Sequence, residues 1–246
     1  MVDATDDDFI GGRLKLLQPV KGFRAGVDSV MAAAAVPAHA GDTVLDVGAG
    51  VGVISLTLAK RVNGLRITAL EKSHDHYELL QQNIDRNQMT GHVTPLQADI
   101  FDQLKWPEPN SFHHVVTNPP YYQDGSVQIA PSQEKAGAHA GPRGFLRDWL
   151  YQSVRMVRPG GILTMVYPST ALANVVACLE PRLGDIVIFP LWPHAGQRAK
   201  RFILQGKKGA RGPTSLEPGL VLHGAGTGFT EQAEAILRHG NSLTLS

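Results

Sequence analysis

The stretch Thr43-Val44-Leu45-Asp46-Val47-Gly48-Ala49-Gly50-Val51-Gly52 decides the fold of this 246-residue chain. Its first five residues have the apolar character of a buried strand, and its glycines predict a tight turn that leads into a helix. Such a turn lets the backbone approach a ligand closely. The spacing is Gly-x-Gly-x-Gly, whereas the dinucleotide fingerprint Gly-x-Gly-x-x-Gly would need a glycine where Val53 stands.

Strands and helices alternate along the rest of the chain. Helices are predicted over 53–62, 74–88, 145–157 and 169–179, and strands over 65–70, 92–96, 112–116, 162–167, 186–191 and 200–205. Ser73 and Ser169 are expected to cap the helices that follow them, and the run 158–161 (Arg-Pro-Gly-Gly) is expected to end a helix. The alternation predicts an α/β fold with a parallel sheet. The last two strands are joined too briefly for a helical crossover, so they should be antiparallel.

The composition favours a single domain that is stable without covalent cross-links. The chain is 43% hydrophobic and has one cysteine, Cys178, so it can bury a large core but cannot form an internal disulfide or a cysteine-based metal site. No apolar run reaches the length of a bilayer, and the acidic start (1–8) lacks the form of a signal peptide. We therefore expect a cytoplasmic single domain without a metal or an obligatory protein partner. It comprises an N-terminal extension (1–42), a catalytic core (43–206) and a basic C-terminal extension (207–246).

Acidic residues stand at three successive predicted strand ends, at Asp46, Glu71 and Asp99. Ligands collect at the carboxyl ends of the strands in open α/β sheets. A carboxylate at 46 would repel a pyrophosphate and attract an ammonium, one at 71 can accept both hydroxyls of a ribose, and one at 99 can accept from an adenine amino group. This order describes a cationic nucleoside without phosphate. The predicted cofactor is therefore S-adenosylmethionine, bound also by Gly48, Gly50 and Gly52.

A second site follows the predicted strand 112–116, at Asn118-Pro119-Pro120-Tyr121. Asn118 offers a side-chain carbonyl, and the prolines lack N–H donors, so the backbone there presents only acceptors. Tyr121 adds a flat ring with a polar tip. Together these predicted catalytic residues suit a planar group that carries an NH2, such as an adenine, cytosine, guanine or carboxamide edge.

With these motifs in this order, the chain resembles the class I methyltransferases. The resemblance implies a Rossmann-like, seven-stranded mixed sheet flanked by helices on both faces, with the last strand antiparallel, and it adds Asn118 to the cofactor site. Relatives with Asn-Pro-Pro-Tyr methylate exocyclic or amide nitrogens. In the implied mechanism Asn118 and the Pro119 carbonyl accept the two N–H bonds of the amine, and Tyr121 holds the ring in line with the methyl group.

The ends of the chain narrow the resemblance. The segments 9–14 (Phe-Ile-Gly-Gly-Arg-Leu), 22–29 (Gly-Phe-Arg-Ala-Gly-Val-Asp-Ser) and 190–193 (Pro-Leu-Trp-Pro) are similar to those of bacterial adenosine-N6 methyltransferases that act beside the anticodon of a valine tRNA. The resemblance implies that the N-terminal extension contributes to the site, with Arg24, Gly26 and Asp28 over the methionine end of the cofactor. A tRNA substrate is implied as well.

The distribution of charge supports RNA more than the net charge of +1 does, because no acidic residue lies between Asp185 and Glu217. Candidate phosphate contacts in and beside this window are Arg198, Lys200, Arg201, Lys207, Lys208 and Arg211. The connection 122–141 is long enough to close over a target base. Two alternatives stay open: a methyltransferase that modifies a glutamine side chain of a protein such as a release factor, and an RNA-binding module that kept the fold and lost turnover.

Overall fold

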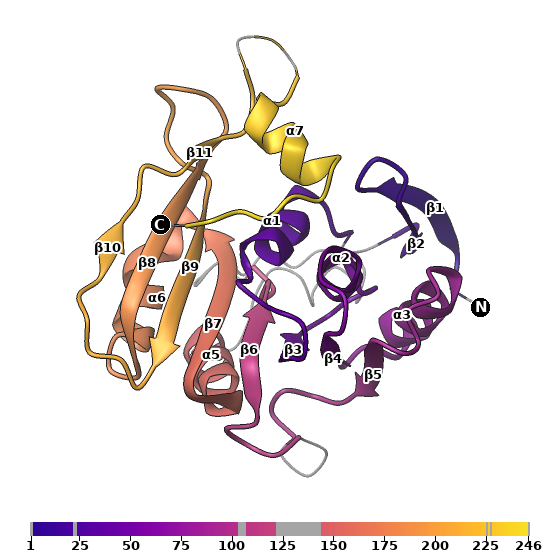
Figure 1. The fold of residues 1–246 in the computed structure, drawn as a ribbon, viewed down its shortest axis with the longest axis horizontal. Helices are drawn as coiled ribbons and strands as arrows, with labels where there is room; N and C mark the ends of the chain where they lie inside the picture. The colour runs from indigo at the N-terminus through magenta and orange to yellow at the C-terminus, as the bar shows by residue number, and fades with distance from the viewer. Residues whose placement is uncertain are drawn as a thin grey trace, which may run out of the picture.

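The apolar segments of the sequence form the long strands of one central sheet, and helices cover both of its faces in the computed structural model of the chain (Figure 1). The structure describes residues 2–21, 24–102, 107–121, 144–224, 226 and 228–245. The strands are β1 (Ala4–Phe9), β2 (Leu14–Pro19), β3 (Thr43–Val47), β4 (Arg66–Glu71), β5 (Val93–Gln97), β6 (Phe112–Thr117), β7 (Val157–Pro168), β8 (Leu183–Trp192), β9 (Arg201–Lys208), β10 (Ser215–Leu216) and β11 (Leu220–Val221). The helices are α1 (Val27–Ala35), α2 (Val53–Arg61), α3 (His74–Arg86), α5 (Phe145–Met156), α6 (Leu172–Leu179) and α7 (Glu231–Leu237).

Seven long strands lie in the order β8-β9-β7-β6-β3-β4-β5, and the short strands β10 and β11 extend the sheet by pairing with β8. β9 is antiparallel to both β7 and β8, whereas the other long strands pair in parallel. This confirms the predicted seven-stranded mixed sheet and the antiparallel final strand. The chain leaves β3 toward β4 and β5 and returns to β6 on the other side of β3, so the order of strands reverses between β3 and β6. Ligands of open α/β sheets bind at such a point.

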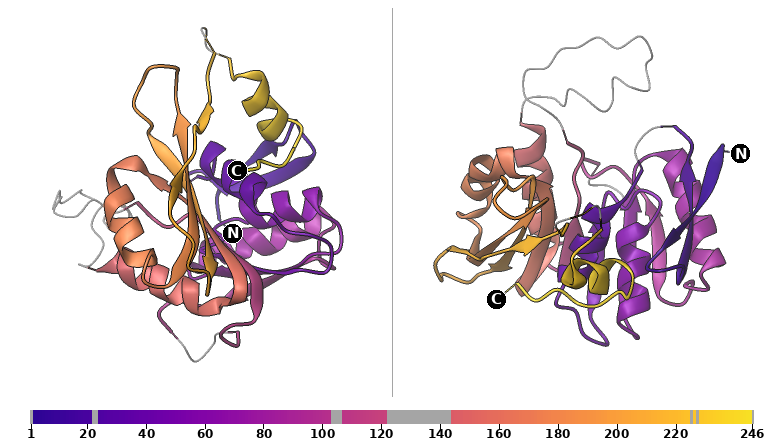
Figure 2. Two further views of the ribbon diagram at one scale, coloured as in Figure 1. Left: turned by 60° about the vertical axis from the view of Figure 1, so that its left-hand side comes forward. Right: turned by 90° about the horizontal axis from the view of Figure 1, so that it is seen from above.

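The two faces of the sheet are covered by different groups of helices. Residues of α1, α2, α3 and α7 belong to the hydrophobic core on one face, and residues of α5 and α6 belong to the core on the other. Figure 2 shows the yellow helix α7 and the salmon helices α5 and α6 on opposite sides of the sheet. Strands buried on both faces explain why the apolar residues of 43–47 and 112–117 do not alternate with exposed polar ones.

The N-terminal extension forms an antiparallel hairpin, β1–β2, which packs beside α3 and outside the central sheet (Figure 1). Two asparagines of α3 pair with its backbone. Asn83 accepts from the Leu17 N–H at 2.7 Å and donates to the Leu17 carbonyl at 3.0 Å, and Asn87 makes the equivalent pair with Lys15 at 3.1 and 2.9 Å. The side chains of α3 thus replace a third strand at this edge of the hairpin.

One local prediction is wrong. Ser169 does not cap a helix by hydrogen bonding, because its hydroxyl donates to the Ala199 carbonyl at 2.5 Å and α6 begins three residues later, after a 3-10 turn. The helix before the run 158–161 does end as predicted, at Met156, and the run itself lies within β7. There the backbone at Gly161 passes so near the His113 carbonyl that a Cβ would approach it to 2.7 Å. Ser73 does cap α3, since its hydroxyl accepts from the His76 N–H.

The connection 122–141, predicted to close over a target base, lies outside the described residues. Within the described part of the chain, no helix is long and apolar enough to cross a membrane.

Candidate active site

The glycine turn after β3 is bound to the end of β4. The N–H groups of Gly48 and Ala49 both donate to the Leu70 carbonyl at 2.9 Å. Gly48, Gly50 and Gly52 have φ angles of 74°, 57° and 96°, a region that favours glycine. A Cβ at Gly48 would come within 2.9 Å of the Trp149 ring, whereas a Cβ at Gly50 would meet nothing within 4 Å. The turn therefore packs tightly on one side and offers an open side at Gly50, where a ligand can approach the backbone.

Asp46 lies directly beneath this turn and is completely buried. Its Oδ2 accepts from the hydroxyl and the N–H of Ser55, at 2.7 and 3.1 Å, while its Oδ1 has no hydrogen-bond partner among the described residues. Burial raises the pKa of Asp46 to about 7, although the bonds from Ser55 oppose the shift. One carboxylate oxygen is therefore left to serve a donor that the chain itself does not provide, such as the ammonium expected from the sequence.

Glu71 is the last residue of β4, and Asp99 follows β5 by two residues at the same edge of the sheet. Glu71 accepts from the Gly50 N–H at 2.8 Å and from the Ser73 N–H at 2.7 Å, so it joins the glycine turn to the start of α3. Partial burial alone would raise the pKa of Asp99, but hydrogen bonds from Lys72 (2.7 Å) and the Phe101 N–H outweigh it and lower the pKa. Both carboxylates are thus held in place by hydrogen-bond donors, and a carboxylate can accept from hydroxyl or amino groups.

The tetrapeptide Asn118–Tyr121 follows β6 at the point where the strand order reverses. The preceding residue, Thr117, is buried and fixes this strand end: its hydroxyl donates to the Val47 carbonyl at 2.8 Å and accepts from the Trp149 indole at 3.0 Å. The glycine turn and the tetrapeptide are thereby held next to each other by adjacent parallel strands. The sequence-predicted cofactor and catalytic motifs do lie at one edge of the sheet.

Asn118 is half-buried and bonded on both sides. Its Nδ2 donates to the Ser29 hydroxyl at 3.2 Å, and its Oδ1 accepts from the Tyr121 hydroxyl at 2.7 Å. Ser29 is buried in α1, so the N-terminal extension positions this side chain. The Tyr121 hydroxyl also lies 3.0 Å from Asp28 Oδ2. Since a phenol has one hydrogen, Tyr121 can satisfy only one of these two acceptors fully at a time.

Tyr121 is enclosed by three side chains. The Arg201 guanidinium lies 4.8 Å from the centroid of the Tyr121 ring, Tyr167 meets the ring edge-on at 5.3 Å, and Asp28 bonds to its hydroxyl. Burial raises the pKa of Tyr121 above its ordinary value, and the negative charge of Asp28 raises it further. Tyr121 is therefore a neutral hydrogen-bond donor and a flat surface at physiological pH, not a base.

Arg24, Gly26 and Asp28, which the resemblance implies over the methionine end of the cofactor, have different surroundings in the structure. Arg24 is bonded to the hairpin, through Asp7 at 2.5 Å, Thr5 at 2.7 Å and the Pro19 carbonyl at 3.2 Å. Gly26 precedes α1, and Asp28 turns toward Tyr121. Sequence reasoning missed two contributors, Ser29 and Tyr167. Tyr167 lies near the carboxyl end of β7, so the rule that placed the other residues could have found it, whereas Ser29 carries no signal of its own.

The six predicted RNA-binding cations do not form one surface, because β9 carries them to opposite edges of the sheet. Arg201 pairs with Pro168 at the carboxyl end of β7, whereas Lys207 pairs with Ile162 far from the site. Lys208 is used structurally: its ammonium donates to the Val154 and Val157 carbonyls, both at 2.8 Å, at the end of α5. Arg198, Lys200, Lys207 and Arg211 are exposed.

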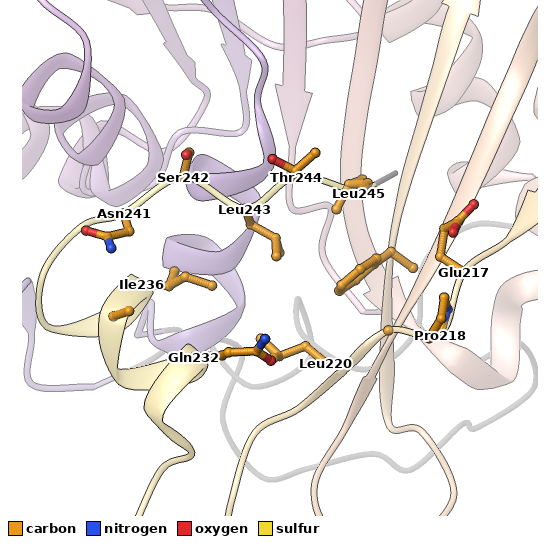
Figure 3. Close-up of a pocket in the computed structure, with 13 residues that line it drawn as sticks. Glu217, Pro218, Leu220, Gln232, Ile236, Asn241, Ser242, Leu243, Thr244 and Leu245 are labelled. Atoms are coloured by element: carbon orange, nitrogen blue, oxygen red, sulfur yellow. The ribbon is translucent and has the colours of Figure 1, made fainter.

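One hollow of the described structure lies away from this site. It has a volume of about 400 Å³ and lies between α7, the C-terminal tail and β8. Figure 3 shows Leu220, Ile236 and Leu243 pointing into it. Its lining includes none of the residues predicted to bind the cofactor or the acceptor. It is therefore not the active site.

Comparison with known proteins agrees with this geometry. The family model described as methyltransferase small domain matches residues 26–184. A curated tRNA1(Val) (adenine(37)-N6)-methyltransferase from Glaesserella parasuis is 31% identical over 128 residues, which are 52% of this chain and 52% of that protein. One from Aeromonas hydrophila is 28% identical over 214 residues, 85% of this chain and 86% of that protein. The chain thus spans about half the length of the Glaesserella parasuis relative.

Solved structures share the fold. A predicted O-methyltransferase from Agrobacterium tumefaciens superposes with a TM-score of 0.74 at 22% identity, covering 88% of this chain and 98% of that chain. M. jannaschii TYW2 in complex with AdoMet superposes with a TM-score of 0.58 at 16% identity, covering 84% and 86%. The prediction of a class I S-adenosylmethionine-dependent methyltransferase is confirmed, and the chain belongs to the methyltransferase small domain family.

Proposed function

We propose that this methyltransferase modifies the exocyclic N6 of an adenosine in tRNA, in the anticodon loop on the 3′ side of the anticodon of a valine tRNA. The observation that carries the proposal is the position of Asn118–Tyr121 at the strand reversal, beside the glycine turn. The names of the relatives, tRNA1(Val) (adenine(37)-N6)-methyltransferases, support this substrate and this atom.

The acceptor site suits an aromatic amine for an electronic reason. The lone pair of such an amine is delocalised into the ring, so the nitrogen is a weak nucleophile. If the Asn118 Oδ1 and the Pro119 carbonyl accept its two N–H bonds, electron density returns to the nitrogen. The same two carbonyl dipoles face the positive charge that develops on the nitrogen during methyl transfer. Positioning and dipoles therefore supply most of the catalysis, and no strong base is needed.

The Tyr121 hydroxyl occupies one of the two lone pairs of the Asn118 Oδ1, so this oxygen accepts more strongly from a substrate amine when the Tyr121 hydrogen is turned elsewhere. Asp28 offers the alternative acceptor at 3.0 Å, and its negative charge makes the bond from Tyr121 stronger than a neutral one. We assign Asp28 the role of holding the Tyr121 hydrogen while the amine occupies Asn118. Tyr121 then presents its ring to the target base.

Residues at the glycine turn would hold the cofactor. The open side of Gly50 admits it to the backbone, and the unpartnered Asp46 Oδ1 and the carboxylates of Glu71 and Asp99 match an ammonium, a ribose and an adenine amino group. When bound, S-adenosylmethionine supplies a methyl group on a positively charged sulfur. Two exposed cations that closely precede Arg201 in the chain, Arg198 and Lys200, are the proposed contacts to RNA phosphates.

The test is mass spectrometry of nucleosides from unmodified tRNA incubated with the enzyme and labelled S-adenosylmethionine. We expect N6-methyladenosine at one anticodon-loop position of a valine tRNA. Methyl transfer to a glutamine side chain of a release factor, with none to RNA, would replace the acceptor by a carboxamide. Calorimetry that shows no binding of S-adenosylmethionine, in a protein that still binds RNA, would favour an RNA-binding module that lost turnover.

A further inference from the structure

A second hollow lies beside the acceptor site, on the α6 face of the sheet. It is a groove of about 500 Å³ with mostly apolar walls. Its lining includes Leu172 of α6, Pro190 and Trp192 of β8, and Leu216 and Pro218 from the segment that follows β9. Leu216 is 69% exposed, the largest exposed fraction among the big apolar side chains described. A mostly apolar lining with a few polar groups is typical of a ligand site.

Arg201 lines the groove and also contacts the acceptor site. Its side chain lines the groove, its guanidinium lies 4.8 Å from the Tyr121 ring centroid, and its Nε donates to Asp28 at 2.9 Å. One side chain therefore separates the groove from the tetrapeptide that receives the methyl acceptor. A substrate long enough to leave the acceptor site on this side must pass over Arg201 and along the groove.

The chemistry of the walls selects a flat, mostly apolar group with hydrogen-bonding edges. The Trp192 indole is anchored by its N–H, which donates to the Pro218 carbonyl at 3.0 Å, so it lines the groove as a fixed aromatic surface. Glu217 adds a carboxylate that can accept from an amino group. The segment that leads to Arg201 carries the exposed cations Arg198 and Lys200. Aromatic and apolar walls bordered by cations are the pattern by which proteins bind unpaired nucleotides.

We propose that this groove binds the nucleobase of the nucleotide next to the target adenosine. The inference rests on the proposed function and deepens it, because it names the contact that would distinguish loop sequences. The base stacks on the apolar walls at Trp192, its phosphate lies toward Lys200, and Arg201 stands between the two bases.

The test is a short hairpin RNA whose loop has one adenosine, together with copies in which the base on either side is removed to leave an abasic sugar. Binding is measured by fluorescence anisotropy and methyl transfer is measured separately. For the wild-type protein, removing one of the two flanking bases should weaken binding roughly tenfold, as stacking on an aromatic side chain predicts. For Trp192→Ala, the intact RNA should bind roughly tenfold more weakly and the same abasic substitution should add little. Trp192→Phe, which keeps an aromatic ring, should retain most of the wild-type affinity and most of its sensitivity to the abasic substitution.

Leu216→Asp provides a second variant that leaves the core untouched, and Tyr151→Asp, on the exposed surface of α5, is its matched control. We expect weaker RNA binding for Leu216→Asp and none of this loss for Tyr151→Asp. If the hairpin is methylated but neither abasic copy nor any groove variant changes binding, the groove proposal is overturned. If the coupling between Trp192 and a flanking base appears in binding while no adenosine is methylated, the groove proposal holds and the proposed acceptor is wrong. Methylation of a glutamine peptide that competes with RNA for the groove would also overturn it.

Discussion

The Nε of Arg201 donates to Asp28 Oδ2 at 2.9 Å, although 173 positions separate the two residues in the chain. The same oxygen is the second acceptor for the Tyr121 hydroxyl. The pair joins the N-terminal extension to the final strand across the proposed acceptor site. Its consequence for catalysis can be measured.

Replacing Asp28 by alanine should leave the Tyr121 hydroxyl bonded only to Asn118, where it competes with the substrate amine for the Asn118 carbonyl. Because a hydrogen bond to a charged group contributes about 1.5–3 kcal/mol, we expect kcat to fall at least roughly tenfold. The Michaelis constant for S-adenosylmethionine should stay the same. In a Tyr121→Phe background, which has no hydroxyl to obstruct Asn118, the same substitution should cost much less. If Asp28→Ala raises the Michaelis constant for S-adenosylmethionine equally in the wild-type and Tyr121→Phe backgrounds, Asp28 contacts the cofactor instead.

Asn118→Ala should remove turnover and spare cofactor binding. It deletes a carbonyl dipole that acts mainly in the transition state, a kind of loss that costs about 10²–10³ in kcat. Calorimetry should give a nearly unchanged dissociation constant for S-adenosylmethionine. A normal rate of methyl transfer by Asn118→Ala would refute the acceptor role of this residue.

Asp46 should make the stability of the cofactor-free protein depend on pH. Burial raises its pKa to about 7 from the ordinary 3.8, so the folded chain holds an extra proton between these values. The stabilisation from this carboxyl is therefore complete below about pH 4 and is lost as the pH rises through about 7. Relative to Asp46→Asn, the wild type should lose on the order of 2–3 kcal/mol of unfolding free energy between about pH 5 and pH 8.

Denaturant unfolding at several pH values checks this prediction, with Asp99→Asn as the control. The pKa of Asp99 is lowered, so its contribution is present above its ordinary pKa and is lost only as the pH falls through the lowered value. The difference in unfolding free energy between the wild type and Asp99→Asn should therefore stay constant over the same pH range. A constant difference for Asp46→Asn as well would mean that the carboxyl is ionised when buried.

The two ends of β9 should respond differently to loss of charge. Lys208→Met removes an ammonium from the last carbonyls of α5 and should lower the free energy of unfolding by about 1 kcal/mol without changing RNA affinity. Arg198→Ala with Lys200→Ala should weaken RNA binding and reduce the slope of log K against log salt by roughly 1.4, about 0.7 for each phosphate contact. Anisotropy titrations over a range of salt measure the slope. An unchanged slope for the double variant would remove this surface from the interface.

Residue patterns were sufficient for the central sheet, because strands buried on both faces must be continuously apolar. They were also sufficient for the edge that carries the site, since parallel strands align their carboxyl ends. The hairpin β1–β2 could not be predicted in this way. Its first strand contains Asp6, Asp7 and Asp8, residues disfavoured in strands, and contacts from distant segments, such as Arg86 to Asp6 at 2.6 Å, offset that preference.

The same limit applies to the site. Motif spacing placed Asn118 and Tyr121, but it did not place Arg201 against the Tyr121 ring, because that contact depends on the register of two antiparallel strands. Charge alone grouped Arg201 with Lys208, whereas in the structure they are the two end residues of β9 and so lie at opposite edges of the sheet. Pairings between distant segments of the chain are the information that single motifs lack.

The direction of β9 makes the register of one strand pair a determinant of the proposed chemistry. Pairing with β7 sets Arg201 opposite Pro168 and Lys207 opposite Ile162. A slip of one residue would turn every side chain of β9 to the opposite face of the sheet. Arg201 would then lose Asp28 and the Tyr121 ring in the same step in which Lys208 lost the carbonyls of α5. A register error in this strand would therefore make the protein both less stable and inactive. Few molecules would then be stably folded and still have a misassembled acceptor site.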